Sequence, residues 1–356
     1  MGLTLETVTK GIEPVSQEWR MKAGNYLKNL AIPQGSLGEL LKLAEQLAAI
    51  KETLKPSVKK KIVVTMAGDH GVVEEGVSAF PQEVTRQMVA NFVAGGAAIN
   101  VLSEVVGARV VVVDMGVAAD LSELVEKGHI LSYKIDYGTK NMTKGPAMTR
   151  EQAQEAIEAG IEIAGKLVEE EGVELFATGD MGIGNTTPSS AILAAMTGFS
   201  VREVTGRGTG IDDEGLENKI RVIQKALEVN KPDAKDALDV LAKVGGFEIG
   251  GIAGLILGAA YHKVPVVVDG FISTAGALIA KGLAPDSVDY MIASHKSVEG
   301  GHQFMWEVLG LRPLLDLNFR LGEGTGAAVA MHIVESAVQV INKMLTFEDA
   351  GVSRNV

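Results

Sequence analysis

Ile62-Val63-Val64-Thr65-Met66-Ala67 is a short and almost uninterrupted apolar run. Such a run is typical of a strand that is buried on both faces of a sheet, because a strand with one wet face alternates apolar and polar residues. Four later runs are similarly apolar and end near Gly, Asp or Thr: residues 110–114, 174–178, 264–269 and 290–294. The sequence therefore predicts a sheet that is covered on both faces.

Helical patterns lie between these apolar runs, for example over residues 149–170 and 214–227. Because strands and helices alternate, we expect an α/β fold: a Rossmann-like, mostly parallel sheet flanked by helices. In such sheets, ligands bind beyond the carboxyl ends of the strands. The segments that follow Thr178, Asp269 and Ser294 are expected at those ends, so they are candidates for a binding site.

The two ends of the chain are also helical in pattern. Amphipathic helices are expected over residues 14–30 and 36–54, and another long helix over residues 325–345. We expect these segments to form a smaller helical lobe. The predicted organisation is an N-terminal helical segment, an α/β catalytic domain, and a loop and helix that return to the lobe: residues 1–60, 61–322 and 323–356.

Composition excludes several classes of protein. A chain of 356 residues with 46% hydrophobic and 22% charged residues is compact and globular, not disordered. The absence of cysteine excludes disulfides, thiolate metal sites and a cysteine nucleophile. A net charge of -12 opposes an extended polyanion, so we expect no nucleic-acid partner.

We expect a soluble, cytoplasmic protein without a membrane partner. The first residues have no basic segment followed by an apolar one. The most apolar stretch, residues 249–257, is too short and too rich in glycine to span a bilayer.

Three glycine-rich loops each carry an acid and at least one Thr: residues 179–188, 205–213 and 320–326. In the last of these, Glu323 is surrounded by glycines that permit tight turns and a close approach to a ligand. A simpler interpretation of Glu323 is a carboxylate stabilised by a helix N-terminus. We favour a half-buried general base, because burial raises the pKa of a carboxyl group toward neutrality.

The segment from Gly182 to Pro188 has two interpretations. It can be a plain turn from strand to helix, with Thr at the N-cap and Pro at the first helical position. It can also be a cradle for a phosphate, since the backbone N–H groups of a helix start bind anions. The preceding strand and the two Thr residues favour the anion site.

Several acids and histidines invite a metal site, but we expect none. Asp212-Asp213-Glu214 is better explained as capping of a helix start. His295 and His302, with Glu299 between them, do not match a standard zinc spacing and are interpreted as polar contacts of a loop. His70 follows a strand, and we expect it to orient its loop.

Longer motifs carry a resemblance to a known family. Together with the three glycine loops, the relevant segments are residues 67–72, 76–85, 91–100, 247–251, 268–272 and 315–317. In this order they resemble the nicotinate-nucleotide–dimethylbenzimidazole phosphoribosyltransferases, over about residues 15–340. The resemblance implies transfer of the 5-phosphoribosyl group from nicotinate mononucleotide to dimethylbenzimidazole, giving α-ribazole 5′-phosphate and nicotinate in cobalamin biosynthesis.

The resemblance also implies roles for individual residues. Glu323 would be the general base, and Asp180, where relatives often carry Glu, would be a second carboxylate near the reacting base. The nucleotide would contact Gly182, Gly184, Asn185, Thr186, Gly208, Thr209, Lys219, Asp269, Ser297 and Gly324. The aromatic base would contact Phe80, Gln82, Met88 and Leu321. A homodimer and no cofactor are expected.

Three other functions compete with this transfer. The same chemistry could serve a different azole or a phenolic acceptor. A regulator that binds nucleotides without catalysis is disfavoured, because a pure binder has no need of a base such as Glu323. A nicotinamide-dependent dehydrogenase is disfavoured, because no Gly-x-Gly-x-x-Gly follows the first predicted strand with an acid about twenty residues further on.

Overall fold

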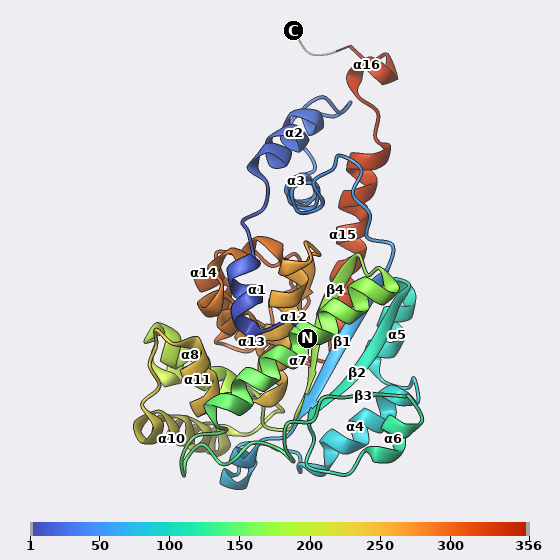
Figure 1. The fold of residues 1–356 in the computed structure, drawn as a ribbon. Coiled ribbons are helices and arrows are strands. Elements are labelled where there is room, and N and C mark those ends of the chain that lie inside the picture. The colour runs from blue at the N-terminus through green and yellow to red at the C-terminus, as the bar shows by residue number, and fades with distance from the viewer. Residues whose placement is uncertain (1–2, 354–356) are drawn as a thin grey trace.

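A computed structural model of the protein describes residues 3–353. Its centre is a sheet of six parallel strands in the order β3-β2-β1-β4-β5-β6 (Figure 1). The strands are β1 (Lys61–Gly68), β2 (Ala108–Gly116), β3 (Leu131–Ser132), β4 (Leu175–Met181), β5 (Val266–Val268) and β6 (Met291–Ala293). The predicted α/β fold with a Rossmann-like parallel sheet is therefore confirmed.

The strand order reverses at the centre of the sheet. β1 pairs with β2 on one side and with β4 on the other, so the chain moves outward in both directions from this pair. At such a switch point the loops diverge beyond the carboxyl ends of the strands and leave a crevice. The loops that follow β1 and β4 border that crevice.

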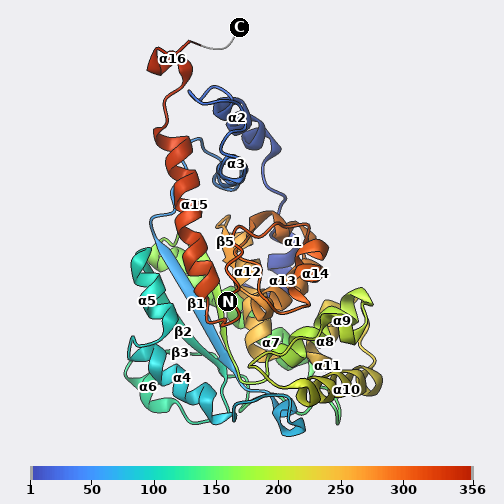
Figure 2. The same ribbon diagram turned by 180° about the vertical axis from the view of Figure 1, so that it is seen from behind.

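Helices cover both faces of the sheet, as Figures 1 and 2 show. α7 (Arg150–Glu171), α12 (Phe247–Tyr261) and α13 (Phe271–Leu283) pack on one face, and α4 (Glu83–Val93), α5 (Ala98–Val105) and α15 (Thr325–Lys343) on the other. Along β1, Ile62 and Val64 belong to the first core and Val63 to the second. The uninterrupted apolar run of β1 thus fills two cores at once.

The remaining helices connect these layers. They are α1 (Leu5–Gly11), α2 (Gln17–Leu27), α3 (Glu39–Lys51), η1 (Gly71–Glu75), α6 (Ser122–Glu126), α8 (Thr186–Thr197), α9 (Val201–Val204), α10 (Asp213–Asn230), α11 (Ala237–Val244), η2 (Pro285–Tyr290), α14 (His302–Leu309) and α16 (Phe347–Ala350).

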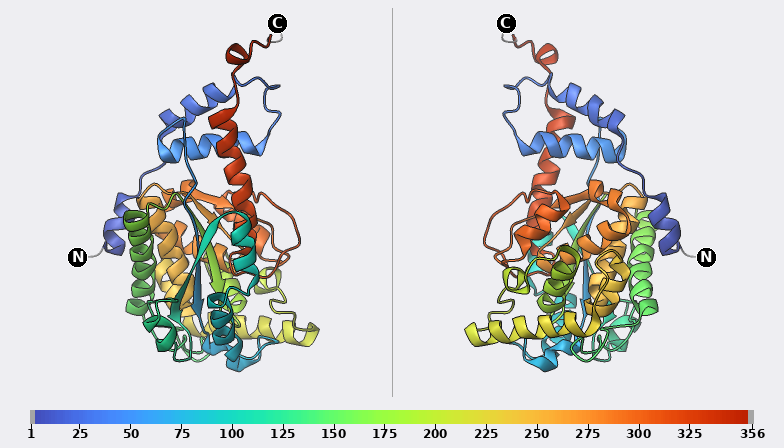
Figure 3. Two further views of the ribbon diagram at one scale, coloured as in Figure 1. Left: turned by 90° about the vertical axis from the view of Figure 1, so that its right-hand side faces the viewer. Right: turned by 90° about the vertical axis from the view of Figure 1, so that its left-hand side faces the viewer.

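Segments from the two ends of the chain lie side by side (Figure 3). α3 packs against both α2 and α15, and the backbone of Leu30 forms a bridge with that of Thr346. α1 instead packs against α7 and α12 of the main body. The lobe therefore consists of α2, α3, the outer part of α15 and α16, and it lies beside the segment that enters β1.

One stretch of the described chain, residues 83–105, is long and apolar enough by composition to cross a membrane. The structure divides it into α4, with 11 residues, and α5, with 8, and Gly95 between them has a left-handed φ of 75°. Neither helix reaches the roughly 20 residues that a membrane span needs.

Candidate active site

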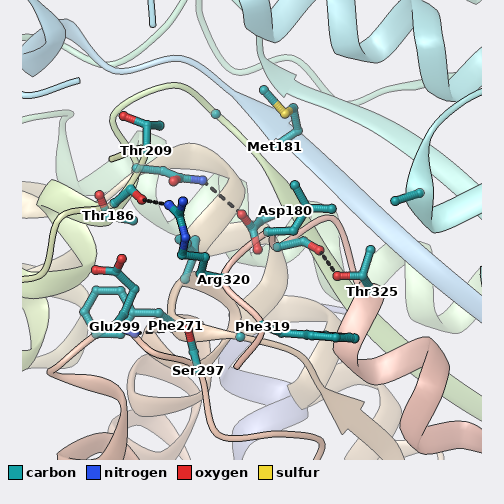
Figure 4. A pocket seen from close by; sticks show the side chains of 18 of the residues that line it. Asp180, Met181, Thr186, Thr209, Phe271, Ser297, Glu299, Phe319, Arg320 and Thr325 are labelled. Carbon is teal, nitrogen blue, oxygen red and sulfur yellow. Dashed lines mark hydrogen bonds between the residues drawn. The ribbon is translucent and has the colours of Figure 1, made fainter. Parts of the chain in front are cut away.

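A cavity of about 620 Å³ lies beyond the carboxyl ends of the strands. All three glycine-rich loops line it, as the sequence predicts, together with the start of α13 and the segment around His295 (Figure 4). Nine of the predicted site residues are in its wall: Phe80, Asp180, Gly182, Asn185, Thr186, Gly208, Thr209, Ser297 and Leu321. The other predicted residues lie behind or beside this wall.

Glu323 occupies a strained position immediately behind the cavity wall. Its φ of 63° is in the left-handed region, which a residue with a side chain rarely adopts without a functional or structural reason. The carboxylate is buried and its Oε2 has no hydrogen-bond partner in the described chain. Burial raises the pKa of Glu323, a backbone hydrogen bond from Ile99 opposes this, and the charge of Asp269 adds to it. Such a carboxylate is a stronger base than one in water.

The backbone around Glu323 is held from several sides. Thr65 Oγ1 donates to the carbonyl of Glu323 at 3.0 Å, and the N–H of Glu323 donates to the carbonyl of Asp180 at 3.2 Å. Asp269 accepts from the N–H groups of Gly324 at 3.1 Å and Ala327 at 2.8 Å. These bonds fix the turn that presents the base.

Asp269 was predicted to contact the nucleotide, and that contact stays a prediction. Its side chain is fully buried outside the cavity wall, and both carboxylate oxygens bind the start of α15. This is a helix N-terminus in which a carboxylate satisfies free N–H groups. Asp269 is therefore a positioning residue for Glu323. Gly324 is likewise in the turn and not in the wall.

Asp180 is the second carboxylate of the site. It is buried in the cavity wall, its Oδ2 accepts from the side-chain amide of Asn185 at 3.1 Å, and its Oδ1 has no partner in the described residues. Burial raises its pKa well above the usual range, and the nearby charge of Asp269 raises it further. A raised pKa favours the protonated carboxyl group, which can donate a hydrogen bond.

The turn before α8 differs from its predicted form. Asn185, not a Thr, is the N-cap residue, and Pro188 is the third helical residue instead of the first. The side chain of Asn185 makes no capping bond, because its amide binds Asp180. Thr187 donates its N–H to the carbonyl of Gly184 at 2.9 Å and Pro188 has no N–H, so among the first three helical residues only Thr186, in the cavity wall, can offer its N–H to a ligand. This arrangement favours the anion site over a plain turn.

Lys219 supports this end of the cavity from behind. It is fully buried, and its ammonium donates to Thr186 Oγ1 at 2.6 Å and to the carbonyl of Gly206 at 3.3 Å. Burial lowers its pKa to about 8, although the charge of Glu299 opposes that shift. A second cation, Arg320, lines the cavity and donates to the carbonyl of Gly208 at 3.1 Å. Arg320 belongs to a predicted glycine loop but was not among the predicted site residues.

The wall also has an apolar part. Phe80 and Leu321 lie there with 51% and 58% of their surface exposed. Gln82 and Met88, predicted beside them, are outside the wall: Gln82 is the N-cap of α4, and Met88 packs against the second core. Apolar residues that were not among the predicted site residues also line the cavity, among them Leu102, Phe271 and Phe319.

The pair of histidines organises a loop, as predicted. His302 is buried, and its Nδ1 accepts from the N–H of Ser297 at 2.9 Å while its Nε2 lies 2.9 Å from Thr274 Oγ1. Burial lowers the pKa of His302 to about 3, so the ring is neutral. The ring of His295 lines the cavity and packs edge-on against Phe319.

Two further sequence interpretations agree with the structure. Asp212 caps α10 by accepting from the N–H of Gly215, and Asp213 pairs with Arg207, as expected for a helix start. His70 is buried behind the site, where its Nε2 lies 2.8 Å from Glu248 Oε1. The backbone of His70 also forms a bridge with that of Thr139, so this residue does orient its loop.

The chain is similar in sequence and in fold to known phosphoribosyltransferases. A phosphoribosyltransferase family model matches residues 12–352. The chain is 57% identical, over 98% of its length and 99% of the other, to the nicotinate-nucleotide–dimethylbenzimidazole phosphoribosyltransferase of Syntrophotalea carbinolica. It is 56% identical to the protein of the same name from Desulforamulus reducens, over 99% of this chain and 100% of that one. The crystal structure of CobT from Thermus thermophilus matches 95% of this chain and 100% of its own, with a TM-score of 0.91 and 46% identity.

Proposed function

The chain belongs to the family of the nicotinate-nucleotide–dimethylbenzimidazole phosphoribosyltransferases, and from this premise we propose how its own residues carry out the transfer. The enzyme moves the 5-phosphoribosyl group of nicotinate mononucleotide to 5,6-dimethylbenzimidazole, with inversion at C1′. The observation that carries the assignment of roles is the buried, partly unpartnered Glu323 carboxylate, held on a fixed turn behind the cavity.

The donor needs little help to break its bond. Nicotinate in the mononucleotide is an N-glycosylated pyridinium, so it leaves by losing positive charge and needs no proton from an acid. The residues of the site must therefore hold C1′ and the acceptor in line, which is where orientation lowers a barrier by several kcal/mol.

The acceptor does need a base. One ring nitrogen of dimethylbenzimidazole attacks C1′, and the N–H on its other nitrogen becomes acidic as the new bond forms. Glu323 accepts that proton, a step typically worth about 10²–10⁴-fold in rate. Its raised pKa suits this task. Burial and the charge of Asp269 raise the pKa of Asp180. We assign Asp180 a hydrogen-bonding role toward the substrates and the role of base to Glu323.

The nucleotide and the aromatic acceptor bind at different ends of the cavity. The phosphate lies at the start of α8, against Thr186, Gly208 and Thr209, with Arg320 beside it and Lys219 behind Thr186. Gly182 and Asn185 line the turn next to the ribose. The aromatic acceptor lies against the exposed faces of Phe80 and Leu321.

We also propose that the protein acts as a cytoplasmic homodimer. Apolar side chains remain uncovered near the mouth of the cavity and on α5, where Val101 and Val105 are 56% and 80% exposed. A second copy would remove this surface from water. Sedimentation equilibrium tests the pairing, and a monomer at micromolar concentration contradicts it.

A direct assay tests the proposed activity. The purified protein is incubated with nicotinate mononucleotide and 5,6-dimethylbenzimidazole, and both released nicotinate and α-ribazole 5′-phosphate are quantified. Equal amounts of both products are expected. Binding of the nucleotide without any product would favour the regulator, and product with p-cresol but not with the azole would favour a phenolic acceptor.

A further inference from the structure

The loop between β6 and α14 carries a buried acid that no step of the transfer uses. Glu299 lines the cavity with only 7% of its surface exposed. Its Oε2 has no hydrogen-bond partner in the described chain. A buried carboxylate oxygen without a hydrogen-bond donor is costly, because it loses its water and gains no bond in return. This cost points to a ligand that supplies the missing donor.

The backbone that carries Glu299 is held firmly. The N–H of Glu299 donates to Ser297 Oγ at 3.3 Å, and its carbonyl accepts from the N–H of His302 at 3.0 Å. The ring of His302 in turn accepts from the N–H of Ser297. Because both backbone groups of Glu299 are engaged, its Cα is fixed, and the 7% exposure of the residue shows that its side chain is packed inside the protein.

The carboxylate lies next to the anion end of the cavity, as the labelled Glu299 and Thr186 show in Figure 4. A Cβ on Gly206 would lie 1.9 Å from Glu299 Oε2, so the acid packs directly on the glycine whose carbonyl binds Lys219. The charge of Glu299 also favours the ammonium form of Lys219. Glu299 is thus adjacent to the phosphate site but, being an acceptor, cannot bind a phosphate.

The chemistry of the remaining ligand groups identifies what Glu299 does bind. On the nucleotide, the groups beside the 5′-phosphate that can donate a hydrogen bond are the ribose hydroxyls. We propose that Glu299 accepts a hydrogen bond from the 2′- or 3′-hydroxyl of the donor ribose, and so selects ribonucleotides. This inference rests on the proposed function, because it assumes that the phosphate lies at the start of α8. Carboxylates read ribose hydroxyls in the same way in dinucleotide-binding sheets.

The test compares nicotinate mononucleotide with its 2′-deoxy and 3′-deoxy analogues, by kcat/KM for nicotinate release. In the wild type, one of the two deoxy analogues should be worse by roughly 10- to 100-fold, as for a lost bond to a charged group. Glu299→Gln should reduce that preference to within about threefold. The quantity compared is the ribo-to-deoxy ratio of kcat/KM in the wild type divided by the same ratio in the variant. This division cancels the intrinsic reactivity of each glycosidic bond.

Two variants make the test specific. Gly206→Ala should lose the same preference, because its methyl group displaces the Glu299 side chain and meets no other residue closely. Glu307→Gln, on the exposed face of α14, should keep the preference. Glu299→Gln keeps nearly the same side-chain volume, so it decides the test if Gly206→Ala fails to fold.

The outcomes are distinct. Equal kcat/KM for all three nucleotides in the wild type overturns the role of Glu299 but leaves the proposed function intact. A preference that survives in Glu299→Gln and Gly206→Ala also overturns it. Failure of the wild type to release nicotinate from any of the nucleotides would instead contradict the proposed function.

Discussion

Two acids lie near opposite ends of strand β4, and they differ in how their oxygens are hydrogen-bonded. Glu174 precedes the strand, and its Oε2 accepts from Ser57 Oγ at 2.9 Å and from the N–H groups of Lys59 at 2.6 Å and Lys60 at 3.1 Å. Asp180, near the other end, has a single bond from Asn185 and a buried oxygen without a partner. An acid at the amino end of the sheet thus has an oxygen with three donors, and an acid at the carboxyl end has an oxygen with none in the described residues.

This difference extends beyond β4. At the amino end, Lys61 donates to Glu335 Oε2 at 2.6 Å and to the carbonyl of Val106 at 2.8 Å. At the carboxyl end, Glu299 and Glu323 each have a buried oxygen without a partner. Asp69 and Glu248, which lie outside the cavity wall, also have a buried oxygen without a partner in the described residues. We expect the unpaired oxygens of Asp180, Glu299 and Glu323, in or beside the cavity, to meet the substrate.

The comparison predicts the largest loss of activity for Glu323→Gln. The amide cannot take the proton of the acceptor, so kcat should fall by about two to four orders of magnitude while nucleotide binding persists. Steady-state kinetics and a nucleotide titration measure both quantities. A variant that keeps more than a tenth of the wild-type kcat would remove Glu323 from the role of base.

A smaller effect is expected for Lys219→Ala. Loss of the buried ammonium behind Thr186 should raise KM for nicotinate mononucleotide by roughly tenfold or more, in line with a lost bond to a charged group. KM for the azole should change by less than about threefold. An equal rise of both constants would mean that Lys219 supports the whole site and not the phosphate end.

The acceptor end should discriminate by shape. A methyl-sized difference in an apolar pocket is worth about 1–3 kcal/mol, so dimethylbenzimidazole should exceed benzimidazole by about 5- to 100-fold in kcat/KM. Adenine should be poorer still, because its amine loses water beside Phe80 and Leu321. Competition assays rank the three bases. A preference for adenine would mean that the acceptor does not bind beside Phe80 and Leu321.

The pH dependence of nucleotide binding should follow Lys219. Burial lowers its pKa to about 8, so the ammonium is present below that pH and is lost above it. KM for nicotinate mononucleotide should therefore rise several-fold between pH 7.5 and about 9, within the tenfold per pH unit that a single group allows. Lys219→Arg, which stays charged, should show no such rise. A rise of the same size in that variant would assign the titration to another group.

The smallest effect on activity belongs to the amino end. Burial raises the pKa of Glu174, but the hydrogen bonds from Lys60, Ser57 and Lys59 outweigh burial, so the pKa lies below the usual 4.5. Its contribution to stability is thus present above pH 4.5 and is lost as the pH falls through the lowered pKa. Glu174→Gln should cost about 1 kcal/mol in urea unfolding at pH 7 and less in acid. A kcat below a third of the wild-type value would break the contrast between the two ends.

The sequence predicted most of the fold because the strong signals are local. Five strands and the long helices α7, α10 and α15 appear within a few residues of their predicted bounds. β3 was not predicted, because the two residues Leu131 and Ser132 give no periodic pattern and pair only at the edge of the sheet. Strands this short depend on tertiary contacts that a local pattern does not contain.

Within the site, prediction worked for the glycine loops and failed where the third dimension decides. Glu299 was considered only as a residue between two histidines, and its contact with Gly206 joins segments far apart in the sequence. Gln82 and Met88 were assigned to the base end, but Gln82 is the N-cap of α4, Met88 lies within α4, and neither is in the cavity wall. Whether a side chain on a helix faces a cavity depends on how that helix packs, which the sequence alone did not reveal.

The long helix α15 gives the enzyme a fixed spacing. At 1.5 Å per residue, its 19 residues span about 28 Å, from the Glu323 turn at one end to α3 in the terminal lobe at the other. Its first turn is held by Asp269 within the buried core. One residue inserted in the middle of α15 would turn its two ends by about 100° relative to each other. Because the inner end is the more firmly held, the lobe would rotate while Glu323 stayed in place. The length of α15 therefore sets the orientation of the lobe relative to the active site.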